Sequence, residues 1–309
     1  MIISAGMRTD IPAYFSDWFY NRINEGFVCV RNPYYPEQVT RYRLTPDVVD
    51  CIHFCTKNPQ PMEARLEEIA QFGQFWSVTI TPYGQEIEPR VPDKDTVIAS
   101  FQRISQKVGA QAMSWRYDPI FISEKYSTEF HIQSFEKIAA QLTGYTKQCV
   151  ISFIDLYAKT RRNFPQAKEV STSDQLRLGK AFAEIGREYH IKIRSCCEGT
   201  LLAPYGIDTS GCVTQPILEH ALGESLHVPK SKKSQRPECN CLLGSDIGAY
   251  NTCAHGCIYC YANYNQALVH QNLALHDPHS PFLIGHAREN DILKEAKQES
   301  YVDSQLSLF

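Results

Sequence analysis

Short apolar runs alternate with stretches of helical periodicity along most of the chain. Runs such as 2–5 and 51–54 are almost wholly apolar, which is typical of parallel strands buried on both faces. Between the runs, apolar side chains recur every three or four residues, as Phe15, Phe19 and Ile23 do. The predicted strands are 2–5, 27–30, 51–54, 76–81, 112–115, 150–153 and 191–194. At least six strand–helix units in alternation predict an α/β fold, built as a parallel (β/α) barrel or partial barrel.

Polar side chains gather directly after the predicted strands. Any one of them could be a helix cap or a solvated loop residue, but they share one topological position. In parallel barrels the loops at the carboxyl ends of the strands form the active site. These residues are Arg8, Thr9, Asp10, Lys57, Asn58, Arg116, Tyr117, Asp118, Asp155, Cys197 and Glu198, with Glu86 and Glu88 in the loop after 76–81.

Composition limits the classes of protein that fit. The 309 residues suffice for one large barrel-type domain with additions or for two smaller domains. A net charge of −3 provides no overall basic field, so contact with a polyanion must be local. The apolar run at the N-terminus is too short for a signal peptide, and no apolar run elsewhere reaches membrane-spanning length.

The chain contains 12 cysteines, a number that indicates a chemical role for some of them. Without a secretion signal they indicate metal ligands and reduced thiols, not a disulfide framework. We therefore expect a cytoplasmic, oxygen-sensitive protein.

The densest cysteine motif lies near the C-terminal end. Cys253, Cys257 and Cys260 are separated by three and then two residues, so three thiols can surround one centre. Thiolates select iron–sulfur clusters or zinc. On a four-iron cluster, three protein ligands leave one iron open, which is what reductive cleavage of S-adenosylmethionine (SAM) requires. The alternatives are a zinc loop or buried thiols, although zinc sites usually show paired CxxC spacing and a fourth ligand.

The stretch around these cysteines, GAYNTCAHGCIYCYANYN, resembles the cluster loop of radical SAM enzymes. The similarity is to the branch of spore photoproduct lyase and its DNA repair photolyase relatives. Other stretches resemble that branch in its own order: SAGMRTDIP, HFCTKNP, VTITPYGQEIEPRVP and WRYDPI. In those enzymes the cluster loop follows the first strand, whereas here it comes last. This order predicts a circular permutation in which 247–251 takes the place of the first strand.

The whole chain also resembles an uncharacterised bacterial family, a domain of unknown function. Together the resemblances imply that Cys253, Cys257 and Cys260 bind a [4Fe–4S] cluster. They imply that Tyr259 lies beside the adenine of SAM. Asp10 or Glu86 would receive the methionine ammonium group, and Lys57 or Arg116 its carboxylate or a substrate phosphate. The relatives' glycine-rich motif with a glutamate for the SAM amino group is not evident, so these contacts rest on position alone.

A second set of cysteines lies upstream. Cys239 and Cys241, with Cys197 and Cys212, could hold a second cluster or a structural zinc ion. Cys197 has an alternative role as a substrate thiol or hydrogen-atom donor, and Tyr117 is a further catalytic candidate. The remaining alternative is that these thiols are buried as small hydrophobic side chains.

We divide the chain into a barrel at 1–225, an iron–sulfur segment packing on it at 226–300, and a flexible tail at 301–309. The tail ends QLSLF and resembles the short peptides that bind the bacterial replication sliding clamp. In that resemblance Gln305 hydrogen-bonds at a small pocket while the apolar side chains through Phe309 enter another.

These features predict a radical SAM-type enzyme that generates a 5′-deoxyadenosyl radical. Its substrate would be nucleic acid in DNA repair, and its electron donor would be a reducing protein. We expect no membrane as a partner. The alternative is a non-catalytic zinc or iron–sulfur binding protein that recruits partners to DNA.

Overall fold

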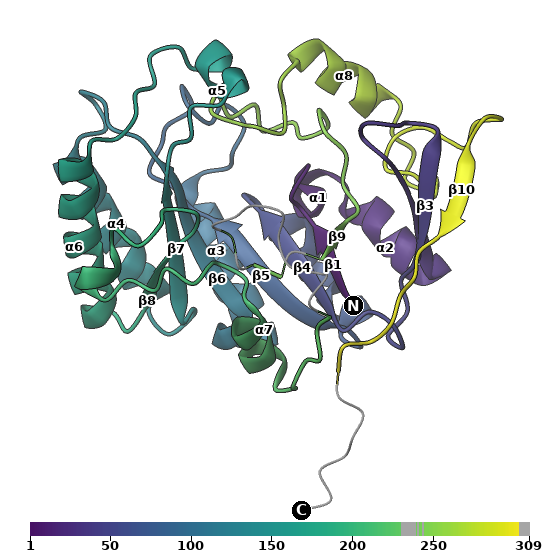
Figure 1. Ribbon diagram of the computed structural model, residues 1–309, viewed down its shortest axis with the longest axis horizontal. Helices are drawn as coiled ribbons and strands as arrows, with labels where there is room; N and C mark the ends of the chain where they lie inside the picture. The colour runs from purple at the N-terminus through teal and green to yellow at the C-terminus, as the bar shows by residue number, and fades with distance from the viewer. Residues whose placement is uncertain (230–238, 240, 243, 303–309) are drawn as a thin grey trace, which may run out of the picture.

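Seven parallel strands form the centre of the computed structural model (Figure 1), which describes residues 1–229, 239, 241–242 and 244–302. In their order across the sheet the strands are β8 (Lys192–Ser195), β7 (Gln148–Phe153), β6 (Met113–Ile120), β5 (Gly73–Thr79), β4 (Cys51–Thr56), β1 (Ile2–Ala5) and β9 (Ser245–Asp246). The predicted α/β fold is thus confirmed. The sheet is open, with β8 and β9 as its edges, and each of the seven strand ranges expected from the sequence overlaps a strand of the structure.

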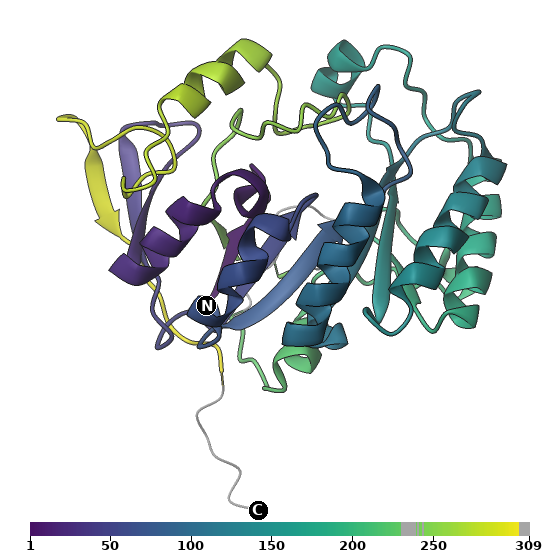
Figure 2. The ribbon, with the colours of Figure 1, turned by 180° about the vertical axis from the view of Figure 1, so that it is seen from behind.

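Helices cover one face of this sheet, seen from behind in Figure 2. Phe54 of β4 stacks on Trp76 of β5 with ring centroids 4.1 Å apart, and Phe19 meets Phe54 edge-on at 5.4 Å. The helices over this face are α2 (Ser16–Glu25), the 3-10 helix η1 (Gln60–Ile69), α3 (Lys94–Val108), α4 (Thr128–Leu142) and α6 (Thr172–Glu188). Their apolar stripes pack against the strands in the main buried core, as helical spacing predicts.

Further helical turns lie in the connections. They are α1 (Ile11–Tyr14), η2 (Ala110–Ala112), α5 (Ala158–Asn163), η3 (Ala203–Tyr205), α7 (Gln215–Leu222) and α8 (Gln266–Ala274).

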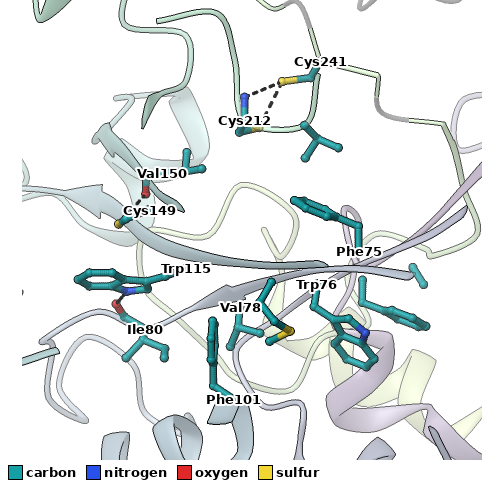
Figure 3. Close-up of a cluster of buried hydrophobic side chains, with 14 of the residues drawn as sticks. Phe75, Trp76, Val78, Ile80, Phe101, Trp115, Cys149, Val150, Cys212 and Cys241 are labelled. Carbon is teal, nitrogen blue, oxygen red and sulfur yellow. Dashed lines mark hydrogen bonds between the residues drawn. The ribbon is translucent and has the colours of Figure 1, made fainter. Parts of the chain in front are cut away.

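The opposite face of the sheet bears cysteines, and we call it the cysteine-bearing face. Because side chains alternate along a strand, Phe75 points to this face while Trp76 points to the helices, as Figure 3 shows. Cys212 and Cys241 lie above Phe75 in the same view. The face is unusually polar for a core, because His53 and Arg116 also belong to it by alternation.

Strand β9 is the last strand of the large sheet in sequence, yet it pairs with the first, β1. Ser245 and Asp246 align in parallel with Ile3 and Ser4, and the Ile247 amide continues the pairing by donating to the Ser4 carbonyl at 3.0 Å. The sequence placed this strand at 247–251. The strand starts two residues earlier, at Ser245, and Ile247 of the predicted range continues its backbone pairing with β1.

A second, smaller sheet was only partly expected. It consists of β2 (Phe27–Arg31), β3 (Gln38–Arg43) and β10 (Ile292–Glu295), with β3 in the middle. Strand β10 belongs to the segment assigned to 226–300, so this segment joins the first part of the chain in two sheets. Tyr301, assigned to the flexible tail, is buried, and its carbonyl accepts from the His227 amide at 2.6 Å.

The two ends of the described chain meet. The Met1 ammonium group donates to the Glu299 carbonyl at 2.7 Å and forms an ion pair with Asp50 at 2.5 Å. Among the described helices, none combines the length and apolar character needed to cross a bilayer.

Candidate metal centre at the carboxyl ends of the strands

The loop that carries Cys253, Cys257 and Cys260 begins directly after β9. Asp246 fixes its start, because its carboxylate accepts from the backbone amides of Met7 at 3.0 Å and Gly248 at 2.6 Å. Arg8 pairs with the same carboxylate at 3.0 Å. The cysteine loop is therefore joined to the loop that follows β1.

His255, between the first two cysteines, joins the loop to two further strands. Its Nε2 lies 2.8 Å from the Asp10 carboxylate, and its Nδ1 lies 2.9 Å from the Tyr14 hydroxyl. Asp10 also accepts from the Lys57 amide at 2.8 Å, directly after β4. The His255 carbonyl accepts from the Arg90 amide at 3.1 Å, in the loop after β5. The cysteine loop consequently lies across the carboxyl ends of β1, β4 and β5.

Glu88 provides the second attachment. Its side chain is 1% exposed and accepts from Lys57 at 2.8 Å, Lys94 at 2.5 Å and Thr81 at 2.6 Å. The Tyr259 hydroxyl donates to the same carboxylate. Burial alone would raise the pKa of Glu88, but the two lysines outweigh it and lower the pKa to about 2. An ionised carboxylate therefore holds Tyr259, next to the last cysteine, beside two cations.

The loop also stabilises its own turn. Asn251 has a φ of 55°, in the left-handed region that asparagine tolerates. Its side-chain oxygen accepts from the Tyr264 amide at 2.9 Å, and Asn272 of α8 donates to its carbonyl at 2.9 Å. Asn263 donates to the Cys253 carbonyl at 2.5 Å. These bonds close the stretch around the three cysteines into a fixed shape.

The three loop thiols are shielded from solvent to different degrees and do not form a tight group. Cys253 and Cys257 are buried and Cys260 is partly buried, and burial raises the pKa of all three, that of Cys257 to about 12. Sulfurs bound to one zinc ion lie within roughly 4 Å of one another because each bond is about 2.3 Å. In the described part of the chain, the compact group of sulfurs within 4.8 Å is a different one, so the loop sulfurs are more widely spaced.

A cavity of about 450 Å³ borders the loop. Its lining includes Arg90, Gly256, Cys257, Asn263, Tyr264 and His270. This volume lies within the range of small-molecule sites.

The structure brings some of the predicted cofactor-binding residues together and separates others. Asp10, Lys57 and Tyr259 meet at the loop. Glu86 instead bonds Lys125 and Tyr126, and these bonds lower its pKa to about 2. It is Glu88, two residues later, that contacts the loop.

Arg116 and Tyr117 point to opposite faces. Arg116 pairs with Asp118 at 2.6 Å on the cysteine-bearing face. Tyr117 is fully buried among the helices and its hydroxyl lies 2.8 Å from His131 Nδ1. The predicted catalytic tyrosine is therefore placed in the core, away from the loop contacts described above.

The second set of cysteines is compact but differs from the predicted membership. Cys212 lies 3.2 Å from Cys241 and 3.5 Å from Cys196, sulfur to sulfur. All three lie within 4.8 Å of one another and could hold a metal ion. Cys197 lies 3.9 Å from Cys196, and neither Cys197 nor Cys239 belongs to the compact group.

Sequence reasoning missed Cys196, His255 and Lys94 as site residues. His255 had a signal, since it lies inside the cysteine motif, and Glu88 was visible in the same loop as Glu86. Nothing in the sequence indicates which of two adjacent cysteines, 196 or 197, faces Cys212.

The fold and its sites define an α/β protein with a parallel sheet, a cysteine loop across the strand ends and a candidate three-cysteine metal site. The family model described as "Domain of unknown function (DUF1848)" matches residues 2–262, and the chain belongs to that family. All the cysteines discussed fall within the matched residues. No curated protein and no solved structure matches the chain.

Proposed function

We propose that this chain is a radical SAM-type iron–sulfur enzyme acting on nucleic acid. The observation that carries the proposal is the position of the cysteine loop across the carboxyl ends of β1, β4 and β5. Parallel β/α proteins form their active sites from the loops at these ends. When bound and reduced, a [4Fe–4S] cluster on Cys253, Cys257 and Cys260 would supply the electron that cleaves SAM to a 5′-deoxyadenosyl radical.

The chain's own residues would orient the cofactors. Lys57 and Lys94 place two positive charges near Cys257, and Glu88 fixes both lysines. The Tyr259 hydroxyl donates to Glu88, and the centroid of the Tyr259 ring lies 6.2 Å from that of the Tyr83 ring. A rigid aromatic edge of this kind suits the adenine of SAM, the role that the resemblance gives to Tyr259.

The strand order supports the proposed circular permutation. If β9 is counted first, the sheet runs β9, β1, β4, β5, β6, β7 and β8, which is otherwise the order of the chain. The cysteine loop would then follow the first strand, as it does in the radical SAM enzymes that the sequence resembles.

Aromatic and basic side chains beside the loop support a nucleic-acid substrate. Lys159 lies over the rings of Tyr264 at 4.3 Å and Tyr250 at 5.5 Å, and Arg8 lies over Tyr250 at 5.9 Å. Tyr261 is 46% exposed nearby, and Lys159 donates to its carbonyl at 3.3 Å. Stackable rings interleaved with cations are what single-stranded nucleic acid requires.

The decisive test of catalysis is anaerobic. Wild-type protein, reconstituted with iron and sulfide and reduced with dithionite, is expected to release 5′-deoxyadenosine from SAM. The variant with Cys253, Cys257 and Cys260 all replaced by alanine should lose iron and this product, while Cys29→Ala in the small sheet keeps both. A colourless protein without iron, or a triple variant with unchanged iron content, would refute the proposal.

The substrate class has its own test. Fluorescence anisotropy with a labelled single-stranded oligonucleotide should show binding that weakens as salt increases, because phosphate contacts release counterions. Lys159→Ala and Tyr264→Ala should weaken it several-fold, whereas Lys180→Ala on the far side of α6 should not. Equal binding by all variants would exclude this surface.

The clamp-binding peptide at Gln305–Phe309 lies outside the described residues, and its role stays a proposal from sequence. A peptide of residues 300–309 should bind purified sliding clamp, and replacement of Leu308 and Phe309 by alanine should abolish binding. Equal binding by both peptides would remove the clamp as a partner.

A further inference from the structure

Three thiols from distant parts of the chain meet on the cysteine-bearing face. Cys196 follows β8, Cys212 precedes α7, and Cys241 precedes β9. Cys212 and Cys241 are buried and Cys196 is partly buried, and all three are free thiols. Such a convergence of ionisable sulfurs inside a core needs a reason, because buried cysteines that merely fill space need not contact one another.

The spacing indicates a single ion. The sulfur–sulfur distances of 3.2 and 3.5 Å, with all three sulfurs within 4.8 Å, match three ligands bound at about 2.3 Å to one tetrahedral ion. A disulfide between Cys212 and Cys241 would shorten one distance to about 2.05 Å and leave Cys196 unexplained. Cys253, Cys257 and Cys260 differ from this set, because their sulfurs do not all lie within 4.8 Å of one another.

The backbone around the thiols is shaped for them. The Cys212 amide donates to the Cys241 sulfur at 3.2 Å, a bond typical of metal-bound thiolates. Gly211 has a φ of +125°, and a Cβ there would lie 3.1 Å from the same sulfur. The Leu242 amide donates to the Val213 carbonyl at 2.7 Å and holds the two stretches side by side.

We infer that Cys196, Cys212 and Cys241 hold a mononuclear structural zinc ion, separate from the centre on the cysteine loop. Zinc suits this set because it is tetrahedral, takes thiolate ligands and carries no redox chemistry into the core. A solvent molecule completes the coordination as the fourth ligand. The ion ties the end of β8 and the stretch before α7 to the segment that leads into β9. The ion therefore positions the cysteine loop without taking part in its chemistry. The inference of this zinc site does not depend on the proposed radical SAM function.

The test uses the full chain in which Cys253, Cys257 and Cys260 are replaced by alanine, because this variant leaves the second set intact. Grown with zinc and purified anaerobically, it should contain one zinc ion per chain. X-ray absorption at the zinc edge should show at least three sulfur ligands at about 2.3 Å. Cobalt(II) added after zinc removal should give the intense thiolate bands and visible absorption of a tetrahedral site.

Single substitutions assign the ligands. Cys212→Ser and Cys241→Ser should each reduce zinc content at least tenfold, while Cys29→Ala retains one zinc ion per chain. Because these variants can fail to fold, the absorption experiment on the loop variant stands alone as a criterion. No bound zinc, zinc without sulfur ligands, iron at this site, or a Cys212–Cys241 disulfide in anaerobic protein would each overturn the inference.

Discussion

Glu88 is buried and pairs with two partly buried lysines, and replacing it tests how strongly the cysteine loop depends on this carboxylate. We expect Glu88→Gln to cost about 3 kcal/mol of unfolding free energy, because Lys57 and Lys94 would remain partly buried without a counter-charge. Iron content should fall as well, since Tyr259 loses its acceptor. Urea unfolding and iron analysis measure both effects. Glu86→Gln, in the same loop but half-exposed, is the matched control and should change little.

His131 makes stability depend on pH. It is fully buried, with Nε2 3.0 Å from the Phe121 carbonyl, and burial lowers its pKa from 6.5 to about 4. The unfolded chain therefore binds a proton at His131 below pH 6.5 that the folded chain does not bind until about pH 4. Stability should fall as the pH decreases through this window, by up to roughly 3 kcal/mol from this residue.

The difference between variants isolates that contribution. His131→Gln should be less stable at pH 7 but should lose less stability between pH 6.5 and pH 4, as measured by urea unfolding at each pH. His220→Gln, at an exposed position on α7, should keep the wild-type slope. If the His131→Gln slope equals the wild-type slope, His131 does not titrate in this window.

At this scale the sequence predicted residue types better than contacts. The cysteine loop was found because its spacing is local, and Asp10 and Lys57 were found because both follow strands. The choice of Glu86 over Glu88, and of Cys197 over Cys196, depended on which way a side chain turns in an irregular loop. No local periodicity encodes that direction.

Strand β9 has two residues, and a glycine just before it controls whether it can pair with β1. Gly244 has a φ of +66°, and a Cβ there would lie 2.4 Å from the Ile2 carbonyl oxygen. Gly223 has a similar φ of +72° with no atom within 4 Å of such a Cβ. Gly223→Ala should therefore cost about 1 kcal/mol from backbone strain alone.

Gly244→Ala should cost about 1–3 kcal/mol more, because the backbone must move away from Ile2. Since the cysteine loop begins directly after β9, iron binding should also weaken in this variant and not in Gly223→Ala. Thermal unfolding and iron titration distinguish the two. Equal losses in both variants would mean that β9 pairing does not position the loop.

Elements with strong periodicity were predicted, and elements defined by distant partners were not. The apolar strands of the large sheet were visible because each is buried on both faces. Strands β3 and β10 were missed: all four residues of β10 are exposed, and its partner β3 lies some 250 positions earlier. Helical spacing of Met62, Leu66 and Ile69 does not distinguish an α-helix from the 3-10 helix η1 that these residues form, in which Pro61 removes one amide donor.

The adjacent chain ends allow the proposed permutation to be tested directly. A chain that starts at residue 239, continues from Val302 through a short glycine–serine linker to Met1, and ends at residue 229 should fold. Its circular dichroism spectrum and iron content should match those of the wild type, because Met1 already contacts Glu299. A permutant opened between Ser100 and Phe101 inside α3 is the control that should not fold. Failure of the first permutant to bind iron would show that the native strand order is required.

At the scale of the whole molecule, the sequence predicted the α/β class, but it did not determine whether the parallel sheet closes into a barrel. Six strand–helix units imply a parallel sheet, but whether its edges meet depends on strand tilt and stagger, which no single segment determines. The edge strand β9 carries a polar pair, Ser245 and Asp246, so its place beside β1 followed from motif order and not from hydrophobicity.

The pairing of β9 with β1 also has a consequence for biosynthesis. Ile3 leaves the ribosome near the start of translation, but its partner Ser245 follows about 240 residues later, roughly 12–50 s at 5–20 residues per second. Throughout that time β1 presents an unpaired edge to other nascent chains. Because the cysteine loop follows β9 directly in the chain, a metal centre on its three thiols could be assembled only late in synthesis, after most of the sheet has been made.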